Sequence, residues 1–130
     1  MSTQDHERFA TTLLERAASD LAALKLLAAA ESTREIAGFH AQQAVEKSLK
    51  SALFRNGVEP PRTHNLRYLL DLATQAGLAP PLSESQADEL TPYAVDFRYV
   101  PAPEDANTLE IIPLVESVVA WAAQQPESML

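Results

Sequence analysis

Polar side chains that could bind a ligand recur at helical spacing in the segment FHAQQAVEKSLKSALF, residues 39–54. This segment carries Gln43, Glu46, Lys47 and Lys50, with Glu46 and Lys50 in the favourable i, i+4 order. A solvated helix face needs only charges, whereas this face sets long side chains beside small residues. We therefore expect it to be half-buried, with its polar groups engaged by other residues of the domain or by a second copy.

A second group of candidate residues lies in RTHNL, where an extended connector meets a predicted third helix. In one interpretation, His64 binds a phosphate together with Arg62 and Lys50 at the helix N-terminus, where free backbone N–H groups help. In the alternative, His64 is structural: it caps the helix and hydrogen-bonds to Gln43 or Glu46, which fixes the loop to the rest of the domain.

A third group, Tyr93, Arg98 and Tyr99, precedes a proline-rich loop. A tyrosine and an arginine can stack on a base and hold a phosphate. Alternatively, Arg98 pairs with Glu46 and a tyrosine packs under the loop. Because an unpaired, half-buried carboxylate would be costly, we expect Glu46 to have a distant partner, either Arg98 or His64. The predicted ligand-binding surface comprises Gln43, Lys47, Lys50, Arg62, His64, Arg98 and Tyr99.

The composition restricts the class of protein that can carry these residues. The chain has 130 residues, 46% hydrophobic and 22% charged, which suits a single globular domain over residues 1–130. It lacks cysteine and any apolar run of about 18 residues, so we expect no disulfide, no membrane span and a cytoplasmic location. The spacing of histidines and carboxylates suggests no metal site, and we expect no cofactor.

The net charge of −8 argues against a protein that coats nucleic acid. The charge is uneven, however, because residues 47–67 contain five cations and one acid, Glu59. Such a local basic patch on an acidic body suits a confined anionic ligand. The alternative is that the patch is an ordinary solvated surface.

Apolar residues at intervals of three and four predict an all-α fold, an up-and-down antiparallel bundle of four to five helices. The first helix should run from about residue 6 to 30. The second should run from residue 33 or 34 to 56, followed by Gly57 in a left-handed conformation. Small residues on the second helix form a seam that another helix can approach closely, and from this seam we expect a homodimer. The seam comprises Ala41, Ala44, Ser48 and Ala52.

Three shorter or later helices should complete the bundle. The third is capped by Thr63 or Asn65 and ends at Gly77, and the fourth begins after a capping-box pattern at Ser83. The last helix is expected from about residue 105 to 125. Pro113 lies inside its apolar stripe, which favours a kink there over a later start near residue 112.

The segment FHAQQAVEKSLKSALFRNGVEPPRTHNLRYLLDLA, residues 39–73, resembles the signature of the HEPN domain (higher eukaryotes and prokaryotes nucleotide-binding). The pattern is an aromatic residue, H-A-Q-Q-A-x-E-K-x-L-K, a glycine turn, a proline, and T-H-x-L before a leucine-rich helix. YAVDFRYV, residues 93–100, is similar to the Y-x-x-x-R-Y-P element of the family, with Val100 where the proline is common. The resemblance extends over roughly residues 8–124.

This resemblance implies a helical bundle, often dimeric, with one of two functions. Some members are ribonucleases, many of them toxins, and others are nucleotide-binding or partner-binding modules. Many bacterial members are encoded beside a minimal nucleotidyltransferase. The resemblance therefore also implies a nucleotide ligand or such a partner, in a pair of the toxin–antitoxin type.

The ribonucleases of this family use an R-x(4–6)-H motif near the last helix, which this sequence lacks. Metal-independent cleavage of RNA needs a group that titrates near neutral pH, but no histidine follows Arg98, and Glu104 and Asp105 stand there instead. An R-x5-H match ending at His40 lies in the second helix, and we treat it as chance. We therefore predict a non-catalytic binding module. Two alternatives stay open: a ribonuclease in which His40 or His64 acts with Arg98, and a purely structural dimerising bundle.

Overall fold

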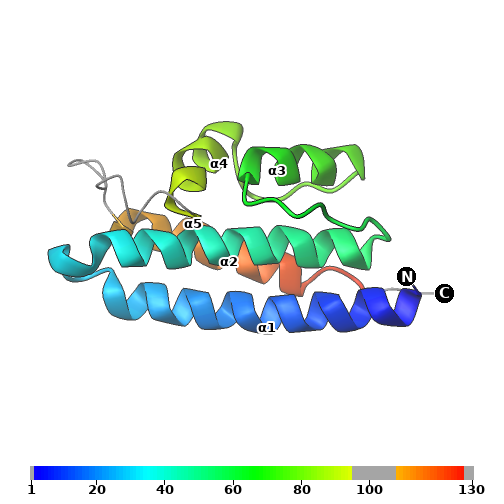
Figure 1. Ribbon diagram of the computed structural model, residues 1–130, viewed down its shortest axis with the longest axis horizontal. Coiled ribbons are helices and arrows are strands. Elements are labelled where there is room, and N and C mark those ends of the chain that lie inside the picture. Colours follow the sequence, from blue (N-terminus) through cyan, green and yellow to red (C-terminus); the bar gives the residue numbers. More distant parts are fainter. Residues whose placement is uncertain (1, 95–107, 128–130) are drawn as a thin grey trace.

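Two long antiparallel helices form one side of the protein (Figure 1). The computed structural model describes residues 2–94 and 108–127. Helix α1, Thr3–Leu27, is followed by a short 3-10 turn, η1, Glu31–Thr33, and by helix α2, Arg34–Arg55, which runs back beside α1. Both long helices agree with the spans predicted from the apolar spacing.

The third helix, α3, Leu66–Gln75, begins where the sequence carries two candidate caps. The side chain of Asn65 accepts a hydrogen bond from a backbone N–H of the first turn, so Asn65 is the cap and Thr63 is not. Gly57 and Gly77 have φ values of 76° and 84°, and they follow α2 and α3 as left-handed turn residues. Both helix ends were therefore predicted correctly.

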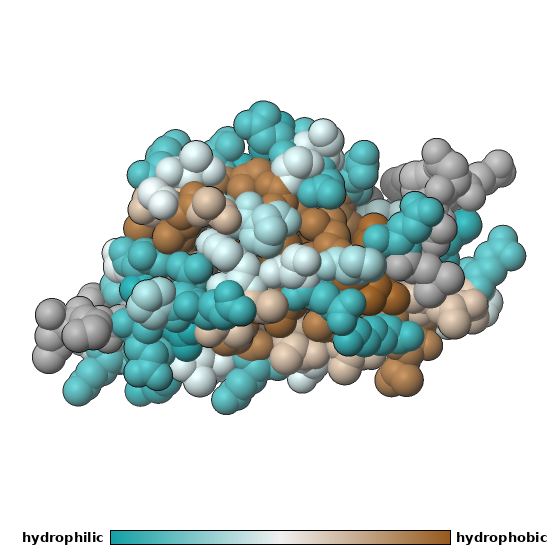
Figure 2. Space-filling model, turned by 180° about the vertical axis from the view of Figure 1, so that it is seen from behind, coloured by the Kyte–Doolittle hydropathy of each residue, from teal (hydrophilic) through white to brown (hydrophobic). Residues whose placement is uncertain are grey.

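The capping box predicted at Ser83 starts helix α4, Glu84–Leu90, which continues into a second 3-10 turn, η2, Thr91–Ala94. Helix α5, Thr108–Ala123, contains Pro113 in its interior, so the alternative start near residue 112 is wrong. In Figure 1, α3 and α4 lie above α2 and α5 lies behind it. Seen from behind, apolar residues gather along the middle of the face, and polar residues border them (Figure 2).

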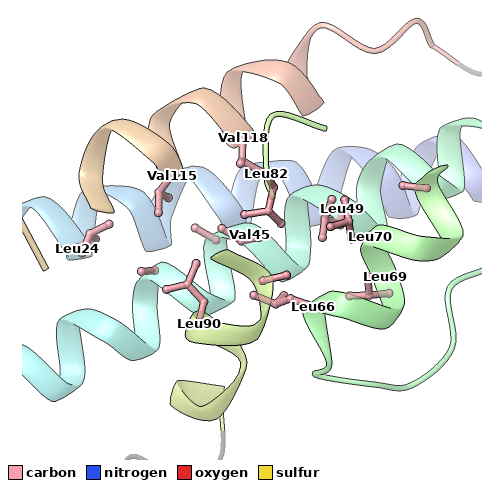
Figure 3. Packing of buried hydrophobic residues seen from close by; sticks show 14 of the residues in the cluster. Leu24, Val45, Leu49, Leu66, Leu69, Leu70, Leu82, Leu90, Val115 and Val118 are labelled. Carbon is pink, nitrogen blue, oxygen red and sulfur yellow. The ribbon is translucent and has the colours of Figure 1, made fainter. Parts of the chain in front are cut away.

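Among the described residues there are five α-helices and no strand, so the predicted all-α bundle is confirmed. The same residues include no helix that is long and apolar enough to cross a membrane. One apolar core lies around α2, which packs against α1, α3 and α5 (Figure 3). Its larger members are Leu24 of α1, Val45 and Leu49 of α2, Leu66, Leu69 and Leu70 of α3, Leu82 before α4, Leu90 of α4, and Val115 and Val118 of α5.

The seam of small residues on α2 faces the interior of the chain. All four of its members have no exposed surface: Ala41, Ala44, Ser48 and Ala52. Beside them, the hydroxyl group of Ser51 donates a hydrogen bond to the carbonyl oxygen of Ala10 in α1, at 2.8 Å. The seam therefore serves close packing within one chain and is not the interface of a homodimer. The homodimer stays a prediction, and its interface would have to lie elsewhere.

Candidate ligand-binding site

Helix α2 is buried along most of its length, and a single line of side chains reaches solvent. Between residues 37 and 53, the positions that are not buried are 39, 40, 43, 47 and 50. Residues three and four apart share one face of a helix, so four of these positions form a continuous stripe. We call His40, Gln43, Lys47 and Lys50 the α2 stripe. In Figure 1, α2 lies between α1 below and α3 with its preceding loop above.

Asp20 of α1 contacts two members of the α2 stripe, His40 and Lys47. Its side chain is buried, with 8% of the residue exposed. The Lys47 ammonium group donates to Oδ2 at 2.6 Å, and Nδ1 of His40 lies 2.9 Å from Oδ1. A carboxylate that loses its hydration needs such partners. The two contacts fix the ammonium group and the imidazole ring in place before any ligand binds.

Glu46 of α2 contacts Lys50, the last member of the stripe. Glu46 is buried, with 5% of the residue exposed. Its Oε1 lies 2.8 Å from Nδ1 of His64 and accepts a hydrogen bond from Nε2 of Gln42 at 3.1 Å. Its Oε2 accepts from the ammonium group of Lys50 at 3.2 Å. Nε2 of Gln42 also donates to the backbone oxygen of His64 at 3.0 Å, and Gln43 donates to Oε1 of Gln42 at 2.7 Å. The loop before α3 is thereby bound to α2 through both an imidazole ring and a carbonyl group.

The expectation that Glu46 has a distant partner is confirmed, and that partner is His64. The structural interpretation of His64 is correct in its contact with Glu46 but wrong in one detail, because Asn65 caps α3. The ring of His64 still reaches solvent, since 58% of its side chain is exposed. Arg62 is exposed and has no ion pair within the part of the chain that the structure describes. Arg98 and Tyr99 lie outside the described residues, as does the possible Arg98–Glu46 pair.

The whole helical unit can be compared with known proteins. The family model for the HEPN domain matches residues 10–125. The chain belongs to the HEPN family. Comparisons with curated proteins and with solved structures found no match. The HEPN match extends from α1 to the end of α5, so the contacts of both buried carboxylates lie within the HEPN unit.

In this HEPN domain, the signature at residues 39–73 falls on α2, the following loop and α3. Its Gln42, Glu46 and His64 are the residues that fasten the loop to α2. No three histidine or acidic side chains among the described residues are grouped so that they could hold a metal ion. What the site does offer is a row of N–H donors, from ammonium, amide and imidazole groups, beside two buried carboxylates.

Two contacts made by α2 were not predicted from the sequence. Asp20 lies on the core-facing line of α1, between Ala17 and Leu24, and an acid on such a line signals a buried partner. At Gly38 of α2, an added Cβ would come within 2.4 Å of the Tyr93 ring, so this ring packs directly on the helix backbone. The sequence pattern gives no signal for this second contact, because the two residues lie far apart in the chain.

Proposed function

We propose that this HEPN domain is a non-catalytic module that binds a nucleotide, and that the α2 stripe and His64 contact its phosphates. The observation that supports the proposal is the stripe itself, a solvent-accessible row of N–H donors on an otherwise buried helix. Phosphate oxygens accept hydrogen bonds from such charged donors. Because Asp20 and Glu46 hold the donors in place, little side-chain freedom remains to be lost on binding.

Pairing with a carboxylate does not remove the lysines as phosphate ligands. An ammonium group has three N–H donors, and the structure shows one of them engaged in each lysine, Lys47 with Asp20 and Lys50 with Glu46. Arg62 would extend the row beyond His64. On sequence grounds, Arg98 and Tyr99 would add a second phosphate contact and a ring for stacking on the base.

A thermal-shift screen of nucleotides tests the proposal, because a ligand that binds only the native state raises its stability. At a hundredfold excess over Kd the gain is about 2.7 kcal/mol, which corresponds to roughly 10 °C in a domain of this size. Lys47→Gln replaces a charged donor of the α2 stripe by a neutral amide, which binds phosphate more weakly, and should abolish the shift. Lys25→Gln is a matched control, because Lys25 also pairs with a carboxylate, Glu116 at 3.0 Å, but lies outside the stripe. The absence of a shift with every nucleotide at millimolar concentration would refute the proposal.

The charge of the stripe supports a second candidate, a protein partner. Both stripe lysines are paired with buried carboxylates, so the surface has no net charge while its imidazole rings are neutral. The partner we propose is a minimal nucleotidyltransferase, in a pair of the toxin–antitoxin type, as the HEPN resemblance implies. When this chain is coexpressed with a minimal nucleotidyltransferase from a gene beside its own, copurification of that protein should be lost with Lys47→Gln and retained with Lys25→Gln. Retention with both variants would place the interface elsewhere.

A further inference from the structure

The charges around the α2 stripe balance one another. Each of the two buried carboxylates, Asp20 and Glu46, contacts one lysine ammonium group and Nδ1 of one histidine. When both imidazole rings are neutral, the two negative charges cancel the two positive charges. A phosphate group that reaches the stripe in this state meets donors without a net positive charge.

The other cations of residues 47–67 do not supply the missing charge. Arg55 pairs with Glu7 of α1 at 3.1 Å. The guanidinium group of Arg67 lies 2.8 Å and 3.0 Å from two carboxylates of α4. Within the described part of the chain, Arg62 is the one cation of this segment without a carboxylate partner. The basic patch seen in the sequence is thus largely neutralised by acids brought to it by the fold.

The two histidines can provide positive charge. In His40 and His64, Nδ1 faces the carboxylate, which leaves Nε2 as the ring atom that can meet a ligand. A neutral ring that donates from Nδ1 has a lone pair on Nε2, and this lone pair repels a phosphate oxygen. A protonated ring donates from both nitrogens. Imidazole is the side chain that exchanges its proton between about pH 5 and 8.

We propose that His40 and His64 take up protons when a phosphate-bearing ligand binds to the α2 stripe. This inference rests on the proposed nucleotide-binding function and states how the site acquires the charge that a phosphate requires. By linkage, one proton taken up per ligand raises the affinity about tenfold for each unit that pH falls through the titration range, and two protons raise it up to about a hundredfold.

The groups around the rings explain why proton uptake would accompany binding. Without an anion, each ring lies beside a carboxylate whose charge an ammonium group already balances. A bound phosphate adds negative charge beside the rings, and a proton on each ring would balance that charge. The charged groups that face the rings are Asp20 of α1 and Lys47 of α2 for His40, and Glu46 and Lys50 of α2 for His64.

Titration calorimetry with the full chain tests the inference, with ADP and, separately, inorganic pyrophosphate as probes. Measurements in Tris and in PIPES, whose ionisation enthalpies differ, give the number of protons taken up. The phosphate groups of both probes also exchange protons in the pH range of imidazole. The protons taken up by the histidines are therefore found by comparing the wild type with His40→Asn and His64→Asn. An asparagine amide keeps a donor for the carboxylate but cannot take up the proton. His6→Asn is the matched control, because His6 packs against Phe54 outside the stripe.

We expect each of His40→Asn and His64→Asn to lose up to one proton of uptake and about tenfold per pH unit in the pH dependence of affinity, while His6→Asn matches the wild type. If His64→Asn does not fold, the loss of proton uptake in His40→Asn decides. Binding with the same proton uptake in wild type and variants would overturn the inference and leave the proposed function standing. The absence of binding by either probe at every pH would overturn both.

Discussion

Glu46 provides the sharpest test of the site, because removal of its carboxylate affects three donors at once. Gln42, Lys50 and His64 all direct N–H groups at this side chain, and Glu46 itself is 5% exposed. In Glu46→Ala, the ammonium group of Lys50 would lose its counter-ion while 16% of its side chain is exposed. The loop before α3 would lose one of its two contacts with the Gln42–Glu46 region of α2.

The size of the effect follows from how far each donor can reach water. Leaving a buried ion unpaired costs about 3–5 kcal/mol, and leaving a neutral hydrogen-bonding group unpaired costs about 1–3 kcal/mol. These values are upper limits here, because Lys50 can extend toward solvent and Gln42 still donates to the carbonyl oxygen of His64. The half-exposed ring of His64 adds little. We therefore expect Glu46→Ala to lower the free energy of unfolding by about 2–3 kcal/mol.

Urea unfolding measures this loss directly. With an m value of about 1–3 kcal/mol per molar urea, the midpoint should fall by roughly 0.7–3 M. Glu46→Gln keeps one acceptor oxygen for Gln42 and His64 but loses the charge and the acceptor for Lys50, so its midpoint should lie between those of Glu46→Ala and the wild type. Glu89→Ala is the control, because Glu89 is exposed on α4, and it should change stability by less than about 0.5 kcal/mol. A midpoint for Glu46→Ala equal to that of Glu89→Ala would refute the reasoning and make the face a solvated stripe.

Three other experiments test the packing, the second buried carboxylate and the predicted lack of ribonuclease activity. Gly38→Ala should lower the melting temperature and cost about 1–3 kcal/mol, since the new Cβ would lie 2.4 Å from the Tyr93 ring; an unchanged melting temperature would contradict this packing. Asp20→Asn should cost about 1–3 kcal/mol in urea unfolding, because the amide leaves the charge of Lys47 unanswered; a loss below about 0.5 kcal/mol would show that the contact is not stabilising. The purified chain should leave a panel of RNAs intact, because no histidine follows Arg98; cleavage that disappears with Arg98→Ala would contradict this.

The helices could be predicted because their signals are local. The apolar spacing, the capping box at Ser83 and the glycines at 57 and 77 act within a few residues, and the structure follows all of them. Where two local signals competed, the sequence could not decide. Thr63 and Asn65 are both good caps, and Asn65 caps α3.

The site was predicted only in part, because sequence patterns report on neighbouring residues and not on contacts between separate helices. A half-buried carboxylate at Glu46 requires a partner, and this requirement led to His64. No such argument led to Asp20 or its contact with His40, because that contact depends on how α1 is aligned along α2, which the periodicity of either helix leaves open. For the same reason, the sequence did not show that the seam of small residues on α2 is covered within the chain, and we interpreted it as a dimer interface.

The pairing of each stripe lysine with a buried acid has a consequence for ligand choice. A surface of unpaired lysines would attract any polyanion, including nucleic acid. Here Asp20 and Glu46 cancel that attraction at long range but leave N–H donors on Lys47 and Lys50 available at contact distance. A ligand must therefore match the positions of the donors to bind, and a long polyanion gains little from its total charge. The acidic body of the protein, with a net charge of −8, acts in the same direction. The arrangement favours a small, confined phosphate group over a nucleic-acid backbone.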